Sequence, residues 1–470
     1  VVARHPKTWF DCRRDNKSRF TVDLTMLMTG ILLITLVGLS TTSVESFAVK
    51  QTPVFDGSLP PERSSYPSES FEARSFFKHE IIHESTKPGS RARVGRIHTP
   101  HGIVDTPGFV AVATNGALKA LDIKDADAAG QQLIFCNSYH LMLQPGPDLI
   151  EAAGGLHKFM HREAGPIITD SGGFQIFSLA HGSVHADIGE LNKEPTSELK
   201  RAKVRVGPSS GDKGKPVVKV TENGCIFRSY RDGRYVELTP ESTVLAQKKY
   251  GSDIIIPLDE LPPYNTSPER LRESVLMSHR WEDRSLREHL KNVAGQAMYA
   301  VVHGGVDKNL RQLSVDVLTS MPFDGFAVGG SLGSCHEELV DLLSFVIPKL
   351  PREKPNHLLG IADEQSIAAA IPFGVDTFDS CFPTRLARHG TLLTKKGKLH
   401  VKKQVCATSF GKPICDSCSC STCRNYDLAY LHHLQKAKEP LLQQLASIHN
   451  IQFMNDLMAG YRAKILANEI

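Results

Sequence analysis

Three short apolar runs in this sequence each end on an aspartate, and this pattern constrains the fold more than any other feature. The runs are Ile167–Asp170, Ile254–Asp259 and Val375–Asp379. Runs of this kind are typical of buried strands. A carboxylate at the carboxyl end of a strand is where a (β/α)8 barrel keeps its catalytic groups, so the three aspartates indicate a barrel enzyme.

Length and composition are consistent with a large globular fold. The chain has 470 residues, of which 41% are apolar and 23% charged, so it has the material for a large core and is not disordered overall. One large domain with an appendage is favoured over several small ones. The net charge of +4 is too small to indicate nucleic-acid binding by itself.

Apolar runs alternate with helix-like stretches along most of the chain. Eight runs are predicted to be strands: Gly108–Ala113, Leu133–Asn137, Ile167–Asp170, Ile254–Asp259, Tyr299–His303, Gly325–Gly329, His357–Ile361 and Asp376–Asp379. Helices are predicted over Glu269–Leu290 and Glu337–Leu350. Eight strands is the number that a closed (β/α)8 TIM barrel requires. An open doubly wound sheet is the alternative, because the alternation alone does not distinguish closed from open sheets.

The amino terminus resembles a targeting sequence. The apolar run Ile31–Leu39 is too short to span a membrane, and small residues and Phe47 follow it, as in a signal peptide and its cleavage region. We therefore predict a presequence and disordered linker over residues 1–75 and an organellar location, plastid rather than mitochondrion, with no membrane association in the mature form. A secreted enzyme, a buried strand or helix, and a cytoplasmic enzyme with an artefactual leader in the gene model are the alternatives.

Residues 76–470 are predicted to form the barrel domain with two additions. Residues 181–219 are rich in Gly, Pro, Lys and Glu without periodicity, which predicts a surface insertion. Residues 406–450 are predicted to form a metal-binding subdomain near the carboxyl terminus.

The prediction of a metal site depends on four clustered cysteines: Cys415, Cys418, Cys420 and Cys423. Thiolates at such spacing suit a tetrahedral zinc ion, and redox pairing is the alternative. A histidine further along can complete the site. His449 is available, although a lone histidine in such a place is more often a core residue than a ligand.

A basic stretch separates the last aspartate of the strands from the cysteines. No Asp or Glu occurs between Asp379 and Asp416, whereas this stretch holds Arg385, Arg388 and several lysines. Such a run suits a phosphate backbone, and a solvated basic surface is the alternative.

Taken together, these motifs resemble the tRNA-guanine transglycosylases, which exchange a guanine at the anticodon wobble position for queuine or a precursor base. The matching stretches are Asn137–Leu141, Gly154–His157, Thr169–Gln175, Leu258–Glu260, Phe378–Asp379 and Pro383–Arg385, followed by the cysteine pattern. The resemblance implies that Cys418, Cys420, Cys423 and His449 bind a structural Zn²⁺, which leaves Cys415 as a spare thiol.

The resemblance also implies roles for two of the aspartates. Asp379 matches the family nucleophile, which forms a covalent aspartyl-ribosyl intermediate, and Asp170 matches the general acid/base. A non-catalytic tRNA-binding subunit of a heterodimeric enzyme is the alternative, and retention of both aspartates argues against it. A phosphate-binding barrel enzyme of small-molecule metabolism is a third possibility, but no Gly-rich phosphate motif follows the last strand.

Five residues lie at the family's base-binding positions, and four of them match the family. Phe174 matches the aromatic side chain that stacks on the base, Asp259 matches the carboxylate that accepts its N–H groups, and Gly329 and Gly330 match the loop that approaches it. His303 stands where the family commonly has Gln, so base preference is expected to differ.

The resemblance also gives expectations about partners. Arg385 and Arg388 match phosphate-facing arginines beside the nucleophile, so the expected partner is a tRNA with a wobble guanine. A homodimer, or a heterodimer with a related subunit, is expected through the zinc-binding subdomain.

Overall fold

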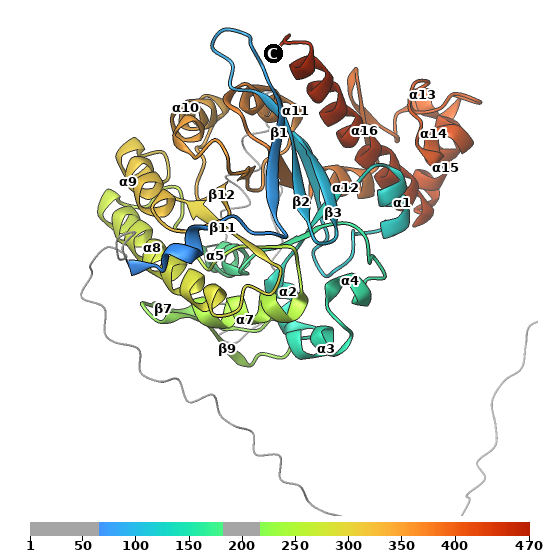
Figure 1. Ribbon diagram of the computed structural model, residues 1–470. Coiled ribbons are helices and arrows are strands. Elements are labelled where there is room, and N and C mark those ends of the chain that lie inside the picture. Colours follow the sequence, from blue (N-terminus) through green and yellow to red (C-terminus); the bar gives the residue numbers. More distant parts are fainter. Residues whose placement is uncertain (1–64, 182–216) are drawn as a thin grey trace, which may run out of the picture. The chain divides into compact units, whose positions relative to one another are not determined.

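Eight parallel strands form a closed barrel in the computed structural model, which describes residues 65–181 and 217–470 (Figure 1). The strands are β4 Gly108–Val112, β5 Leu133–Cys136, β6 Ile167–Thr169, β10 Ile254–Ile255, β11 Ala297–Val302, β12 Gly325–Val328, β13 Asn356–Leu358 and β14 Thr377–Ser380. They pair in chain order, and β14 closes the ring on β4. The predicted (β/α)8 barrel is confirmed, and the open sheet is excluded.

Alternate residues of each strand face opposite sides of the barrel wall. In β11, Tyr299 and Val301 pack with Ile168 in the barrel interior, whereas Met298 and Ala300 join the cluster shared with the outer helices. Both faces are therefore covered by apolar side chains. This is why the strands appear in the sequence as continuous apolar runs.

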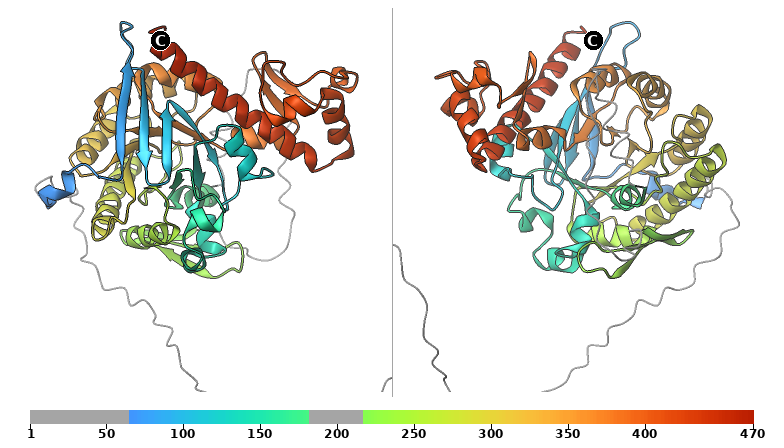
Figure 2. Two further views of the ribbon diagram at one scale, coloured as in Figure 1. Left: turned by 45° about the vertical axis from the view of Figure 1, so that its right-hand side comes forward. Right: turned by 180° about the vertical axis from the view of Figure 1, so that it is seen from behind.

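Helices follow the strands and surround the barrel (Figures 1 and 2). The larger ones are α5 Gly173–His181, α7 Pro240–Tyr250, α8 Pro268–Leu290, α9 Lys308–Thr319, α10 His336–Val346, α11 Glu364–Ala370 and α12 Phe382–Arg388. The shorter ones are α1 Ile123–Ala128, α2 Ser138–Leu143, α3 Pro147–Ala152 and α4 Leu156–Phe159. The Ser267 side chain caps α8 by accepting a hydrogen bond from the Arg270 N–H, and Pro268 supplies a preformed first turn.

A three-stranded antiparallel sheet that was not predicted covers the amino-terminal end of the barrel. Its strands are β1 Lys78–Glu84, β2 Arg93–Thr99 and β3 Gly102–Thr106. Ile97 and Val104 from this sheet belong to the same buried cluster as the barrel interior. The sheet therefore closes the end of the barrel at which the strands begin.

Buried polar contacts hold this sheet to the barrel. Arg93 in β2 donates to both carboxylate oxygens of Asp376, at 2.9 and 2.5 Å, just before β14. Asp253, just before β10, accepts from His101 at 2.8 Å and His157 at 3.1 Å. Each carboxylate has its charge compensated by neighbouring donors, as buried carboxylates require.

A second antiparallel sheet packs beside α8. It consists of β7 Val217–Thr221, β8 Gly224–Arg228 and β9 Tyr235–Leu238. The predicted insertion ended at residue 219, but residues 217–219 already belong to β7, so that boundary is too late. Residues 182–216 lie outside the described residues.

The carboxyl-terminal part leaves the barrel and returns to it (Figure 2). It consists of the hairpin β15 Thr391–Thr394 and β16 Gly397–His400, the helices α13 Gln404–Ala407, α14 Ser421–Asn425 and α15 Leu428–Ala437, and the long helix α16 Leu441–Leu466. Helix α16 packs against α12, β4 and β15, so it joins the cysteine-rich segment to the barrel wall.

The described structure begins before the predicted domain boundary at residue 75. Tyr66 is buried, and its hydroxyl donates to Asp283 at 2.5 Å. Residues 65–75 therefore pack on the barrel and are not linker, because Tyr66 brings an apolar ring with a hydrogen-bonding hydroxyl. Residues 1–64 lie outside the described residues.

Among the helices that the structure describes, none combines the length and apolar character needed to cross a membrane.

The buried Arg93–Asp376 pair gives a stability prediction. The variant Arg93→Met should lower the free energy of unfolding by about 3–5 kcal/mol, because Asp376 would remain buried without its cation. The matched control is Arg96→Met, whose partner Asp105 is 35% exposed and whose change should stay below about 1 kcal/mol. Urea denaturation of the two variants measures the difference, and equal losses would contradict this role of Arg93.

Candidate active site and metal centre

The three aspartates predicted from the sequence lie at the carboxyl ends of barrel strands. Asp170 directly follows β6, Asp379 lies in β14, and Asp259 follows β10 in the loop that leads to α8. The closed barrel brings these three strand ends to one rim, opposite to the end covered by β1–β3.

Asp379 is held through one of its two carboxylate oxygens. His357 Nε2 lies 3.0 Å from Oδ1, and the Gly360 N–H donates to the same oxygen at 2.7 Å. The other ring nitrogen of His357 lies 2.8 Å from Thr377 Oγ1, which fixes the imidazole. Within the described residues Oδ2 accepts no hydrogen bond. His357 and Gly360 were not predicted as neighbours of Asp379, because only the pairing of β13 with β14 brings them to it.

Asp170 has a different environment from Asp379. It accepts hydrogen bonds from Asn137 Nδ2 at 2.7 Å, from the Ser138 N–H at 2.7 Å and from Gln175 Nε2 at 3.0 Å. Burial raises its pKa despite these donors, and the nearby charge of Asp379 raises it further. The carboxyl group of Asp170 therefore keeps its proton to a higher pH than an ordinary aspartate does.

Asp259 and Phe174 lie on segments that approach each other closely. Burial raises the pKa of Asp259 to about 7, and the charges of Asp170 and Glu260 contribute in the same direction. Phe174, at the start of α5, is one of the exposed large apolar side chains, at 37%. A Cβ atom on Gly173 would lie 2.9 Å from the Asp259 carbonyl oxygen, so glycine permits this approach of the two loops.

His303 and the Gly329–Gly330 loop lie next to Asp259. His303 Nε2 is 3.4 Å from Asp259 Oδ2, and a Cβ on Gly330 would lie 3.4 Å from His303 Nδ1. The loop conformation depends on buried Arg311, which donates to the carbonyl oxygens of Gly305, Val302, Gly329 and Ser331. Sequence reasoning missed Arg311, because an arginine on a helix is usually a surface residue.

Arg385 and Arg388 lie on α12, the helix that directly follows the strand of Asp379. Both side chains are partly exposed. The two arginines therefore lie on the helix that follows the carboxyl end of β14, which carries Asp379.

The predicted metal ligands form one cluster. The Nδ1 atom of His449, on α16, lies 3.7, 3.8 and 3.3 Å from the sulfur atoms of Cys418, Cys420 and Cys423. Tetrahedral zinc, with bonds of about 2.3 Å to sulfur and 2.0 Å to nitrogen, sets such ligands about 3.5 Å apart. His449 Nε2 lies 2.8 Å from the Leu393 carbonyl oxygen, which puts the proton on Nε2 and leaves Nδ1 for a metal. Cys415 is outside this group.

Comparison with known proteins identifies the family. The sequence profile described as Queuine tRNA-ribosyltransferase matches residues 88–470. The chain belongs to this family. It is 56% identical over 390 residues to the Queuine tRNA-ribosyltransferase of Protochlamydia amoebophila, covering 83% of this chain and 95% of that protein. The enzyme of the same name from Chlamydia abortus is 46% identical over 394 residues, covering 84% of this chain and 99% of the relative. The predicted family and its class, a transferase, are confirmed.

The predicted organellar location is wrong. These relatives are bacterial enzymes, which have no plastid or mitochondrion to enter, and they resemble the chain across the barrel at up to 56% identity. The prediction depended on the nine-residue run Ile31–Leu39, which precedes both the matched region and the described residues. A short apolar run is a weak basis for a location because core segments have the same composition.

Proposed function

We propose that this protein exchanges the guanine at the wobble position of a tRNA anticodon for queuine or a related 7-deazaguanine. The names of the relatives support this reaction class. The observation that carries the proposal is the pair of differently held carboxylates on one barrel rim, Asp379 with a free oxygen and Asp170 with a raised pKa.

The two carboxylates suit a double displacement. Oδ2 of Asp379 attacks C1′ of the ribose, the bond to the guanine nitrogen breaks, and the base leaves with the electron pair and a proton from Asp170. The incoming base then returns a proton to Asp170 and attacks C1′, which releases Asp379. His357 and Gly360 hold the departing carboxylate through Oδ1, so Asp379 keeps its orientation in both halves of the reaction.

The base is proposed to lie between the loops after β6, β10 and β12. Phe174 offers an exposed aromatic face for stacking, and Asp259 offers acceptors for the N–H groups of the base. A pKa of about 7 means that Asp259 is available in its accepting, ionised form mainly above neutral pH. Gly329, Gly330 and His303 bound the pocket on the side of the base carbonyl.

The tRNA backbone is proposed to meet the basic stretch that begins with Arg385 and Arg388. These two arginines lie on the helix that directly follows the nucleophile's strand, and no acidic residue intervenes before the cysteines. Phosphate contacts of this kind position the substrate without reading its sequence.

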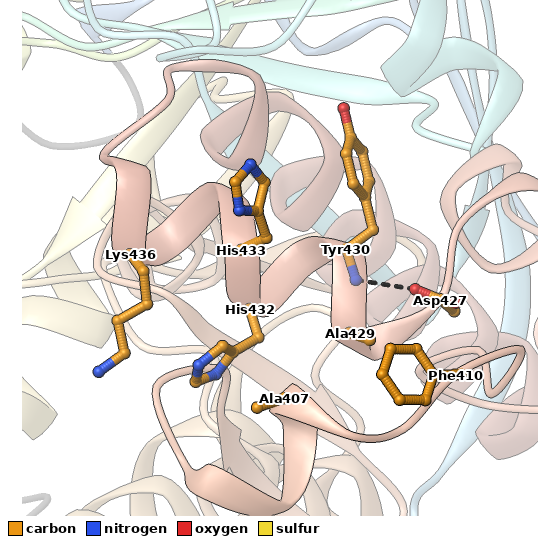
Figure 3. A pocket seen from close by; sticks show the side chains of 8 residues that line it. All are labelled: Ala407, Phe410, Asp427, Ala429, Tyr430, His432, His433 and Lys436. Carbon is orange, nitrogen blue, oxygen red and sulfur yellow. Dashed lines mark hydrogen bonds between the residues drawn. The ribbon is translucent and has the colours of Figure 1, made fainter. Parts of the chain in front are cut away.

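The Cys3His cluster is proposed to hold a structural Zn²⁺ that ties the cysteine loop to α16. The same subdomain is proposed to bind a second copy of this chain. It carries a pocket of about 500 Å³ that is lined by Ala407, Phe410, Asp427, Ala429, Tyr430, His432, His433 and Lys436 (Figure 3). Phe410 is 73% exposed and Tyr430 is 40% exposed, and such aromatic patches are typical of protein interfaces.

An exchange assay tests the proposed activity. Wild-type protein should transfer labelled guanine into unmodified tRNA with a wobble guanine, and Asp379→Asn should reduce the rate at least about 10³-fold, because the amide is a poor nucleophile. Lys308→Met on α9, which removes a surface ion pair with Asp341, is a control for general damage to the protein and should retain most activity.

The outcomes separate the proposal from its alternative. Incorporation that depends on Asp379 supports the enzyme. Binding of tRNA without exchange by the wild-type chain alone, even with added base, would instead indicate the non-catalytic subunit of a heterodimer.

The metal and dimer proposals share one variant. Cys423→Ser should reduce bound zinc from one ion per chain to near zero and convert the dimer to a monomer, because the cysteine loop loses its anchor on α16. Cys415→Ser, outside the cluster, should change neither. Metal analysis and light scattering measure the two effects, and a zinc-free protein that stays dimeric would contradict an interface built on this subdomain.

A further inference from the structure

A buried carboxyl group behind His303 has no role in the reaction described above. Glu282 lies on α8 with a side chain that is 0% exposed, and its Oε2 accepts a hydrogen bond from the Val301 N–H at 3.0 Å. Its other oxygen, Oε1, lies 3.6 Å from His303 Nε2. Both of these atoms are buried and without a hydrogen-bond partner in the part of the chain that the structure describes. Since buried polar atoms are nearly always paired, the two are natural partners for each other.

Neither group has an ion pair with a lysine or arginine within the described residues. The buried guanidinium of Arg311 acts on His303 electrostatically, but its hydrogen bonds go to backbone carbonyl oxygens. Burial raises the pKa of Glu282 well above its ordinary value and lowers the pKa of His303. Each group is therefore neutral and carries one proton.

The surrounding contacts determine where these protons lie. The Val301 N–H makes Oε2 of Glu282 an acceptor, so the carboxyl proton is on Oε1, which faces His303 Nε2. Nε2 is then the acceptor, and the imidazole carries its own proton on Nδ1. Nδ1 lies on the side of the glycine loop, since a Cβ on Gly330 would be 3.4 Å from it.

We propose that Glu282 is a positioning residue for the base pocket. It donates its Oε1 proton to His303 Nε2 and thereby holds His303 as the Nδ1–H tautomer, which presents a donor to a carbonyl group of the bound base beside Gly330. Asp259 Oδ2 lies 3.4 Å from the same Nε2, so without the Glu282 proton the Nε2–H tautomer would be favoured, because Nε2–H faces this carboxylate. The inference rests on the proposed base exchange.

Nitrogen NMR of protein labelled at histidine tests the tautomer without tRNA or base. His303→Gln identifies the His303 signal. Wild type and Glu282→Gln should both show the Nδ1–H form, because the glutamine oxygen can accept from Val301 while its NH2 group donates to Nε2. Glu282→Met cannot donate, and the proton should move to Nε2, beside Asp259. An Nε2–H tautomer in the wild type, or the same change in Glu282→Gln as in Glu282→Met, would overturn the inference.

Kinetics test the consequence for the base. Glu282→Met should raise the KM for guanine about tenfold with kcat within about twofold, the effect of losing one hydrogen bond to a bound ligand. Glu282→Gln should stay within about twofold of the wild type. The double variant Glu282→Met with His303→Gln should regain affinity, because an amide donates without a choice of tautomer. A double variant as weak as Glu282→Met would contradict action through His303.

The two experiments fail independently of each other. A wild-type protein with the Nδ1–H tautomer but no guanine exchange would contradict the proposed function and leave the tautomer assignment intact. Exchange activity together with an Nε2–H tautomer would support the proposed function and contradict the tautomer assignment. If Glu282→Met does not fold, the wild-type tautomer and the Glu282→Gln variant still decide the question.

Discussion

Closure of the parallel barrel, through the pairing of β14 with β4 and of β6 with β10, is the constraint on which the site depends. Parallel strands in a closed ring deliver all their carboxyl ends to one rim, so Asp170, Asp259 and Asp379 converge although more than two hundred residues separate the first from the last. The other rim is closed by β1–β3, and the buried carboxylates of Asp376 and Asp253 hold that end through Arg93 and two histidines. The contacts that hold the β1–β3 sheet and the three aspartates of the proposed reaction thus lie at opposite ends of the barrel.

The carboxyl groups on the functional rim differ because their neighbours differ. Asp379 receives two donors on a single oxygen, whereas Asp170 receives three donors spread over both oxygens. The first arrangement leaves an oxygen to form a bond, and the second holds a proton acceptor in place. For Asp259 the largest effect on the pKa is burial, which raises it to about 7. Three residues of one type therefore serve as nucleophile, proton carrier and base acceptor in the proposed reaction.

Much of the barrel was predictable because strands covered on both faces leave continuous apolar runs in the sequence. The β1–β3 sheet was missed because its exposed and buried positions are irregular: in β1 neither isoleucine is fully buried. The three aspartates and the cluster of three cysteines with His449 were named from motifs, but the residues that contact them were not. His357, Gly360, Arg311 and Glu282 act across strands or from helices, so only the tertiary structure connects them to the site. The cellular location was predicted wrongly because a short apolar run alone does not specify a location.

The central claim is that Asp379 becomes covalently bonded to the ribose of the tRNA. It is tested most directly by mixing the protein with tRNA under conditions in which the second displacement is slow, denaturing the mixture and mapping the modified peptide by mass spectrometry. The account predicts a ribose-linked adduct on the peptide that contains Asp379, present without added base and discharged by guanine. An adduct on Asp170, or active exchange with no trapped adduct, would contradict it.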